Sequence, residues 1–190
     1  VVRVEFYYDD VLAGVDATTP YSITVTNDAA GIHRVYMVAI DNFGRRAYSE
    51  TNRLAVVDNA PPPNDNFRDA IPLSGPAAAD ASHNLSATKE AGEPNHANIR
   101  GPGSVWWTWT PSTSGPATID TVGSDFDTLL AVYVGNAVNQ LTAIASNDDF
   151  SGLQTRVQFN ATTGTVYRVV VDGFSAARGV IRLNIRGAGG

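Results

Sequence analysis

The chain has 190 residues, 43% of them apolar, and a formal net charge of −6. Residues 1–62 carry five Arg and eight acidic residues, and residues 63–190 carry eight Lys or Arg and eleven acidic residues. The net charge is therefore −3 in each part. Such a charge does not favour binding to nucleic acid or to an anionic membrane. Cysteine is absent, which excludes disulfide bonds and thiolate metal sites.

Strand signals dominate the whole sequence. Alternating runs rich in Val, Ile, Thr and Tyr are interrupted by Gly, Pro, Asn or Asp roughly every eight to twelve residues, and no window keeps a helical period over three turns. The longest apolar runs are too short to span a bilayer, and no basic-then-apolar leader is visible. We therefore expect a soluble all-β protein of two β-sandwich domains, without membrane insertion.

Two alternating runs open the chain. Val, Val and Phe recur at every second position within residues 2–7, and Tyr, Ile and Val do so within residues 21–26. Because successive side chains of a strand point to opposite faces, both runs predict half-buried strands.

The strand predicted from His33 onwards is apolar on both faces. Its inward phase contains Val35 and Met37, yet its outward phase is also largely apolar, where a solvent-facing strand should be polar. If the first, third and last strands of this segment are neighbours, they form one apolar outer face, covered either by the second domain or by another subunit. The residues of this predicted interface are Tyr7, Tyr36, Val38, Ile40 and Val57.

Several runs in the first segment resemble bacterial immunoglobulin-like repeats of secreted enzymes and adhesins. These runs are residues 1–7, 12–14, 19–22, 30–31 and 39–44. The resemblance covers residues 1–57 and only the later strands of such a domain, which usually has about one hundred residues. It implies a partial immunoglobulin-like domain, either cut from a longer protein or completed by a neighbouring chain.

Three consecutive prolines interrupt the strand pattern within residues 58–65. Proline removes hydrogen-bond donors and favours an extended path. We place a semi-rigid linker here, between the first domain and a second one at residues 66–187.

The second segment resembles the pre-peptidase C-terminal family along nearly its whole length. The runs that carry the resemblance are NDNF at 64–67, KEAGEPNH at 89–96, SVWWTWT at 104–110, SDFDTLLAVY at 124–133, NDD at 147–149 and YRVVVDG at 167–173. The resemblance implies a jelly-roll-type β-sandwich that is a non-catalytic accessory of secreted or cell-surface bacterial proteins, with calcium bound in some members.

No catalytic machinery is visible. None of the histidines, His33, His83 and His96, lies in a nucleophile elbow or a zinc-protease helix motif, so we predict no enzymatic activity. We interpret His33 as a core residue and His96 as a residue that orders its loop by a hydrogen bond. A Glu93–His96 transition-metal pair is the weaker alternative, because two ligands do not make a site.

Two acidic clusters suggest a calcium site. Asp125 and Asp127 lie two positions apart, and Asn147, Asp148 and Asp149 form a second group of oxygen donors. If the strands beginning at Asp127 and ending near Asn147 are antiparallel neighbours, both clusters reach one end of the sandwich, where their oxygens suit calcium. The alternative is that these residues form Asx turns and bond only backbone amides.

Alternation along the strand predicts that Trp107 and Trp109 face the core and that the side chain of Trp106 points outward. An outward indole could stack on a sugar, or it could lie buried beneath a loop.

The sequence thus favours a non-catalytic accessory or anchoring module of a larger secreted or surface protein of bacteria. Its expected partners are other domains or subunits of the same protein, and a polysaccharide or protein matrix. The rival hypothesis is a structural subunit of an extracellular fibre, in which a neighbouring chain completes the first domain. A carbohydrate-binding module that uses Trp106 is a third hypothesis.

Overall fold

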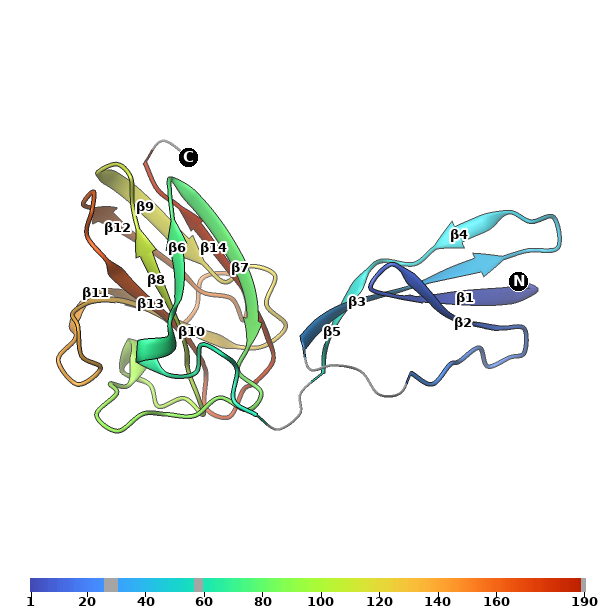
Figure 1. Cartoon of the computed structure of the whole chain (residues 1–190), viewed down its shortest axis with the longest axis horizontal. Helices are drawn as coiled ribbons and strands as arrows, with labels where there is room; N and C mark the ends of the chain where they lie inside the picture. The colour runs from blue at the N-terminus through green and yellow to red at the C-terminus, as the bar shows by residue number, and fades with distance from the viewer. Residues whose placement is uncertain (26–30, 57–59, 189–190) are drawn as a thin grey trace. The chain divides into compact units, whose positions relative to one another are not determined.

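The computed structural model describes residues 1–25, 31–56 and 60–188, and the chain divides into two compact units, Val1–Asp58 and Asn59–Gly190. Both units consist of β-strands (Figure 1). Within the described ranges the helical segments are two short 3-10 turns, η1 (Phe67–Asp69) and η2 (His96–Asn98), and no helix could cross a membrane. The predicted all-β fold is confirmed.

The described strands of the first unit form one antiparallel sheet. Its strands are β1 (Arg3–Tyr8), β2 (Val11–Asp16), β3 (Gly31–Ile40), β4 (Arg46–Tyr48) and β5 (Asn52–Val56). Their order is β2-β1-β3-β4, and β5 pairs with the beginning of β3. The first and third strands and the last one are therefore neighbours, as the outer-face hypothesis assumed.

The strand predicted at residues 21–26 is not present in its described part. Residues 21–25 pair with no strand, although Ser22 donates its backbone amide to Asp16 Oδ2 at 2.8 Å. The Cγ2 atom of Ile23 lies 3.0 Å from the position that a β-carbon on Gly14 would occupy. The alternation of this segment thus reflects packing onto the sheet, since a side chain can be buried without its backbone joining a ladder.

The predicted apolar outer face is covered by side chains of its own domain. Tyr36 stacks on Tyr7 with ring centroids 4.8 Å apart. Val38 and Ile40 are only 0% and 3% exposed, and the ion-paired side chains of Glu5 and Arg46 lie opposite them on the neighbouring strands.

Long charged side chains can cover apolar surface with their aliphatic stems while the charged ends reach water. The premise that Val38 and Ile40 need a partner from outside their own domain is therefore wrong. The fifth residue of that predicted interface, Val57, lies outside the described residues.

The second unit is a sandwich of two sheets (Figure 1). The first sheet has the order β11-β10-β13-β8-β6 and the second β12-β9-β14-β7. The bounds are β6 (Ile71–Ser74), β7 (Ala77–His83), β8 (Val105–Thr110), β9 (Gly115–Asp120), β10 (Thr128–Val134), β11 (Thr142–Asn147), β12 (Arg156–Ala161), β13 (Tyr167–Gly173) and β14 (Val180–Arg186).

The core of this unit lies between its two sheets. Trp107 and Trp109 of β8 pack there with Ile181, Leu183 and Ile185 of β14, and all five side chains are at most 1% exposed. Burial of each large apolar side chain contributes about 2 kcal/mol of transfer free energy, so this core dominates the stability of the unit.

The end of the predicted linker belongs to the second unit. Asn64 is fully buried, and its side-chain amide donates to the Trp106 carbonyl at 3.1 Å. Asp65 accepts hydrogen bonds from the backbone and the hydroxyl group of Thr88. The predicted span of residues 58–65 is thus too long, because these two polar side chains are tied to the sandwich.

Candidate functional site

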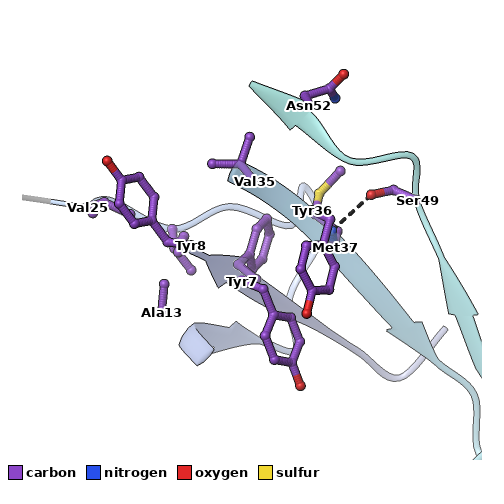
Figure 2. A pocket seen from close by; sticks show the side chains of 11 residues that line it. Tyr7, Tyr8, Ala13, Val25, Val35, Tyr36, Met37, Ser49 and Asn52 are labelled. Carbon is purple, nitrogen blue, oxygen red and sulfur yellow. Dashed lines mark hydrogen bonds between the residues drawn. The ribbon is translucent and has the colours of Figure 1, made fainter. Parts of the chain in front are cut away.

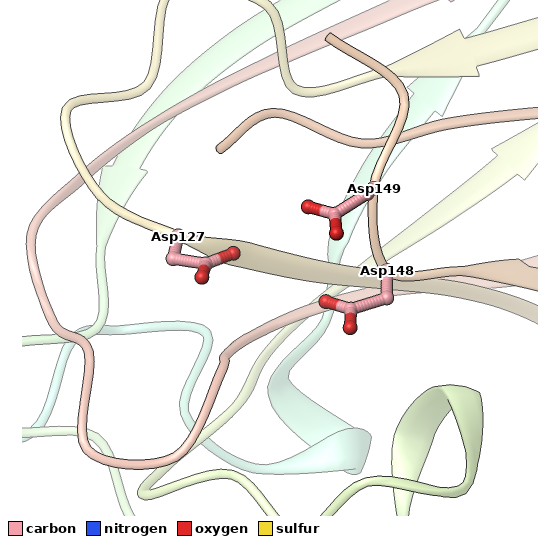
Figure 3. Close-up of side chains that lie close together, drawn as sticks. All are labelled: Asp127, Asp148 and Asp149. Atoms are coloured by element: carbon pink, nitrogen blue, oxygen red, sulfur yellow. The ribbon is translucent and has the colours of Figure 1, made fainter. Parts of the chain in front are cut away.

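Two loops meet at one end of the five-stranded sheet of the second unit. Strands β10 and β11 pair antiparallel, with Leu130 opposite Asn147. Asp127 immediately precedes β10, and Asp148 and Asp149 immediately follow β11. The pairing therefore brings these three carboxylates to the same end of the sheet (Figure 3).

The three carboxylates are close enough to share one ion. One oxygen of each lies within 4.8 Å of one oxygen of the others. Asp127 and Asp148 are half-buried and Asp149 is exposed. None of the three forms an ion pair with a basic side chain within the described ranges.

Two oxygens in this cluster are enclosed without a hydrogen-bond partner. They are Oδ1 of Asp127 and Oδ1 of Asp148. A buried polar atom without a partner costs about 1–3 kcal/mol, and more when it carries charge. The arrangement fits a bound cation, because a hard cation would satisfy both oxygens at once.

Burial and mutual repulsion both favour the protonated forms of two carboxylates in the cluster. Burial raises the pKa of Asp127, and the negative charge of Asp149 raises it further. Burial likewise raises the pKa of Asp148, followed by the charges of Asp149 and Asp127. Either a proton or a cation would relieve this repulsion.

The other two residues of the predicted calcium set have different roles. Asp125 accepts a hydrogen bond from the Val180 backbone amide through Oδ1 at 2.7 Å. Asn147 accepts the Asp148 amide through its own Oδ1 at 3.0 Å and donates to the Asp149 and Arg156 carbonyls. The structure thus brings three of the five predicted residues together. Asn147 bonds backbone groups, as the alternative expected, but its Oδ1 accepts the amide of the next residue and not the amide two residues on that defines an Asx turn.

A buried hydroxyl network supports both loops, and sequence reasoning missed it. Thr128 Oγ1 lies 2.7 Å from Thr121 Oγ1 and 3.2 Å from Thr155 Oγ1. Thr155 also donates its hydroxyl to the Asp148 carbonyl. All three threonines are fully buried, so they fix the backbone that carries Asp127 and Asp148. Threonine is common in strands, and no sequence signal marks these three.

Trp106 is not an exposed binding residue. It projects to the face opposite Trp107, as its phase predicts, but it is 0% exposed. Phe67 of η1 and His96 of η2 cover it edge-on, with ring centroids 5.2 Å and 5.5 Å away. The sugar-stacking alternative for Trp106 is therefore wrong, and the other alternative, an indole buried beneath loops, is what the structure shows.

His96 belongs to a buried polar network. Its Nε2 lies 2.8 Å from Glu93 Oε1, and its Nδ1 lies 3.0 Å from the Tyr133 hydroxyl. Ser104 and Lys89 also donate to Glu93 Oε1. Both ring nitrogens of His96 thus have protein partners, and the Ser104 hydroxyl bonds the carboxylate, not the imidazole.

The protonation of this network follows from its contacts. Burial alone would raise the pKa of Glu93, but hydrogen bonds from His96 and Ser104 and the charge of Lys89 lower it to about 2. Burial lowers the pKa of His96. The pair is thus a carboxylate beside a neutral imidazole, an arrangement that holds the loop of residues 89–104 in place.

The first unit has an open apolar groove on the inward face of its sheet (Figure 2). Its volume is about 210 Å³, and Phe6, Tyr8, Val35 and Met37 line it. Met37 was predicted to be in a core, yet it is 44% exposed. No second sheet formed by the described residues covers this face.

No protein-family model and no curated protein matches the chain. Among solved structures, the chain is similar to the pre-peptidase C-terminal domain of collagenase from Bacillus anthracis, with 13% identity, a TM-score of 0.41, and coverage of 62% of this chain and 94% of that one.

It is also similar to the mitogen of Yersinia pseudotuberculosis, with 14% identity, a TM-score of 0.36, and coverage of 60% and 87%. A third similarity is to a Clostridium perfringens ZmpB structure containing a CBM51 domain with GlcNAc, with 14% identity, a TM-score of 0.28, and coverage of 97% and 40%. At these scores the similarities say nothing about function.

Proposed function

We propose that the second unit is a non-catalytic accessory module of a larger extracellular bacterial protein, and that its β10–β11 end binds one calcium ion. The observation that carries the calcium site is the convergence of Asp127, Asp148 and Asp149, with two enclosed oxygens that have no partner. The accessory role and the location are supported by the sequence resemblance described above.

Calcium suits this cluster better than smaller or softer metals. All three side chains offer carboxylate oxygens, and the cluster contains neither the imidazole nor the thiolate that zinc prefers. Calcium also accepts six to eight oxygens in flexible geometry, so backbone carbonyls and water can complete its shell. The ion would neutralise repulsion between the loops and so stabilise the folded unit.

Thermal unfolding tests the calcium site. A ligand that binds only the folded state raises its stability by about 2.7 kcal/mol at one hundred times its dissociation constant. We expect the midpoint of the whole chain to rise with calcium and to return to its starting value with EGTA. Magnesium at equal concentration serves as the matched control and should have a smaller effect. Identical midpoints in calcium and EGTA would refute the site.

The accessory role requires that the pure protein lack catalytic activity of its own. The contacts of Glu93 with His96 and Ser104 are buried, and in them the serine hydroxyl bonds the carboxylate and not the imidazole. We expect no turnover of peptide, ester or glycoside substrates. Turnover that one point substitution abolishes would contradict this part of the proposal.

The open groove of the first unit favours a second candidate function, a fibre subunit whose neighbour supplies a strand to the inward face. Replacing Met37 with Asp puts a charge into the groove, whereas the same change at the 77% exposed Phe43 does not. We expect electron microscopy to show fibres for the parent chain and Phe43→Asp but not for Met37→Asp. A protein that stays monomeric at all concentrations would exclude this function.

A further inference from the structure

An open cavity at the surface of the sandwich has a basic lining. Its volume is about 600 Å³, within the range of sites for small molecules. Three cationic side chains line it, and no acidic residue does. The lining residues used below are Lys89, Arg100, Gly101, Ser175 and Arg178.

The charge of Lys89 is already balanced. Its Nζ lies 2.9 Å from Glu93 Oε1 and 3.0 Å from Asp172 Oδ2, and both carboxylates are buried. One lysine thus faces two carboxylates in the network behind the cavity, so Lys89 adds no free positive charge to the lining.

Arg178 forms no ion pair with a carboxylate in the part of the chain that the structure describes. Its guanidinium group donates to the carbonyls of Asn84, Leu85, Ala87 and Pro102. These bonds tie two loops together, which is reason enough for an arginine here, but carbonyl groups are dipoles and leave the unit charge in place. Arg178 is half-buried, so solvent screens that charge only in part.

Arg100 and Ser175 are exposed at the edge of the cavity. The structure records no ion pair or hydrogen bond for either side chain within the described ranges. A guanidinium group presents a planar fork of donors that matches the two oxygens of a carboxylate or sulfate. Two such groups and a hydroxyl around one cavity offer hydrogen-bond donors of the kind that an oxyanion accepts.

We propose that this cavity binds a carboxylate or sulfate group carried on a small polar ligand, such as an acidic sugar. Arg100 and Arg178 would contact the oxyanion, and Ser175 would donate a hydrogen bond to it. None of the lining residues is aromatic, which favours recognition of polar groups over stacking. The proposal is independent of the calcium site, since none of the three clustered aspartates lines the cavity.

The test is a titration of the whole chain followed by amide NMR shifts, with sodium glucuronate and glucose 6-sulfate as the two anionic probes and glucose as the neutral control. We expect the amides of Lys89, Gly101 and Ser175 to shift with an anion and not with glucose. Glucuronate alone would identify a carboxylate site, glucose 6-sulfate alone a sulfate site, and both a general oxyanion site.

Substitution then locates the site. Arg100→Gln should weaken binding about tenfold, because it removes a charge-assisted pair. Arg68→Gln is the matched control, since it removes the same charge from an exposed arginine that pairs with Asp69 and does not line the cavity. Binding to Asp148→Asn should equal that of the parent chain, whether or not calcium binds.

Three results would overturn the proposal. They are unshifted amides with both anions, shifts of equal size with glucose, and equal weakening by Arg68→Gln, which would mean diffuse attraction of anions to the surface.

Discussion

Asp127 and Asp148 flank two paired strands of the sandwich, and each keeps one carboxylate oxygen enclosed by protein without a hydrogen-bond partner. Repulsion between their charges lowers the free energy of unfolding, and other interactions of the fold must offset it. Removal of either charge should therefore change both the stability and the binding of a cation.

Replacing Asp148 with Asn should separate the two explanations of the cluster. If the residue serves a cation, the variant loses the calcium-induced rise of the unfolding midpoint. Without calcium it should be as stable as the parent chain or more stable by about 0.5 kcal/mol, because solvent screens most of the repulsion. Thermal melts in calcium and in EGTA measure both effects.

Asp125→Ala is the matched control for that experiment. It removes the acceptor of the Val180 amide and should lower the free energy of unfolding by about 1 kcal/mol. The calcium-induced rise should persist, since Asp125 is not in the cluster. Loss of the rise in Asp125→Ala but not in Asp148→Asn would contradict the assignment.

The stability of the second unit should depend on pH through the same residues. The folded-state pKa values of Asp127 and Asp148 lie above that of an unfolded aspartate, so the folded state holds protons more tightly. Without calcium, their contribution to stability is therefore greatest at low pH and is lost as pH rises through the raised values, above about pH 4.

Calcium stabilisation should grow over the same pH range, since protons then no longer compete with the ion. Melts between about pH 4 and pH 7, with calcium or EGTA, test this opposite dependence. A calcium effect that is constant over the range would count against carboxylate ligands.

Glu93 should contribute to stability in the opposite sense. Its pKa is about 2 in the folded chain, below the ordinary value of 4.5, so its contribution is complete above about pH 4.5 and disappears as pH falls towards 2. Glu93→Gln should lower the free energy of unfolding by about 3 kcal/mol, because Lys89 and His96 lose a buried partner. Urea unfolding at pH 7 measures this loss, and the exposed Asp69→Asn variant should show almost none.

Trp106 should behave as a core residue. Trp106→Ala should lower the free energy of unfolding by about 3–5 kcal/mol, the cost of a large buried cavity. All three tryptophans are 0% exposed, so iodide should hardly quench the fluorescence of the folded chain. Strong quenching that Trp106→Phe abolishes would show that the turns do not cover this side chain.

Arg46 should protect the sheet of the first unit. Its side chain pairs with Glu5 over the face that contains Val38 and Ile40. Arg46→Ala should expose that face and increase binding of a hydrophobic dye. Arg45→Ala removes a neighbouring arginine that pairs with Asp41 and should not. Equal dye binding by the two variants would contradict the covering role.

Alternation along the strands predicted much of this arrangement, and contacts between distant residues decided the remainder. The phase of Trp106 was correct because it depends only on strand geometry, but its cover comes from Phe67 and His96, which no local pattern connects with it. Antiparallel pairing predicted the meeting of Asp127 with Asp148. It could not place Asp125, which lies in a loop before β10 and turns towards Val180.

The threonine network beneath the aspartates has a consequence for the kinetics of the cation site. Thr121, Thr128 and Thr155 already hold the two loops in the conformation that brings the carboxylates together. An arriving ion would therefore find its ligands in position, and the rate of its capture would depend on how fast the ion sheds water, not on protein motion. Calcium bound there would stabilise the folded module without changing the conformation of its loops, so a change in calcium level would alter the free energy of unfolding and not the shape of the module.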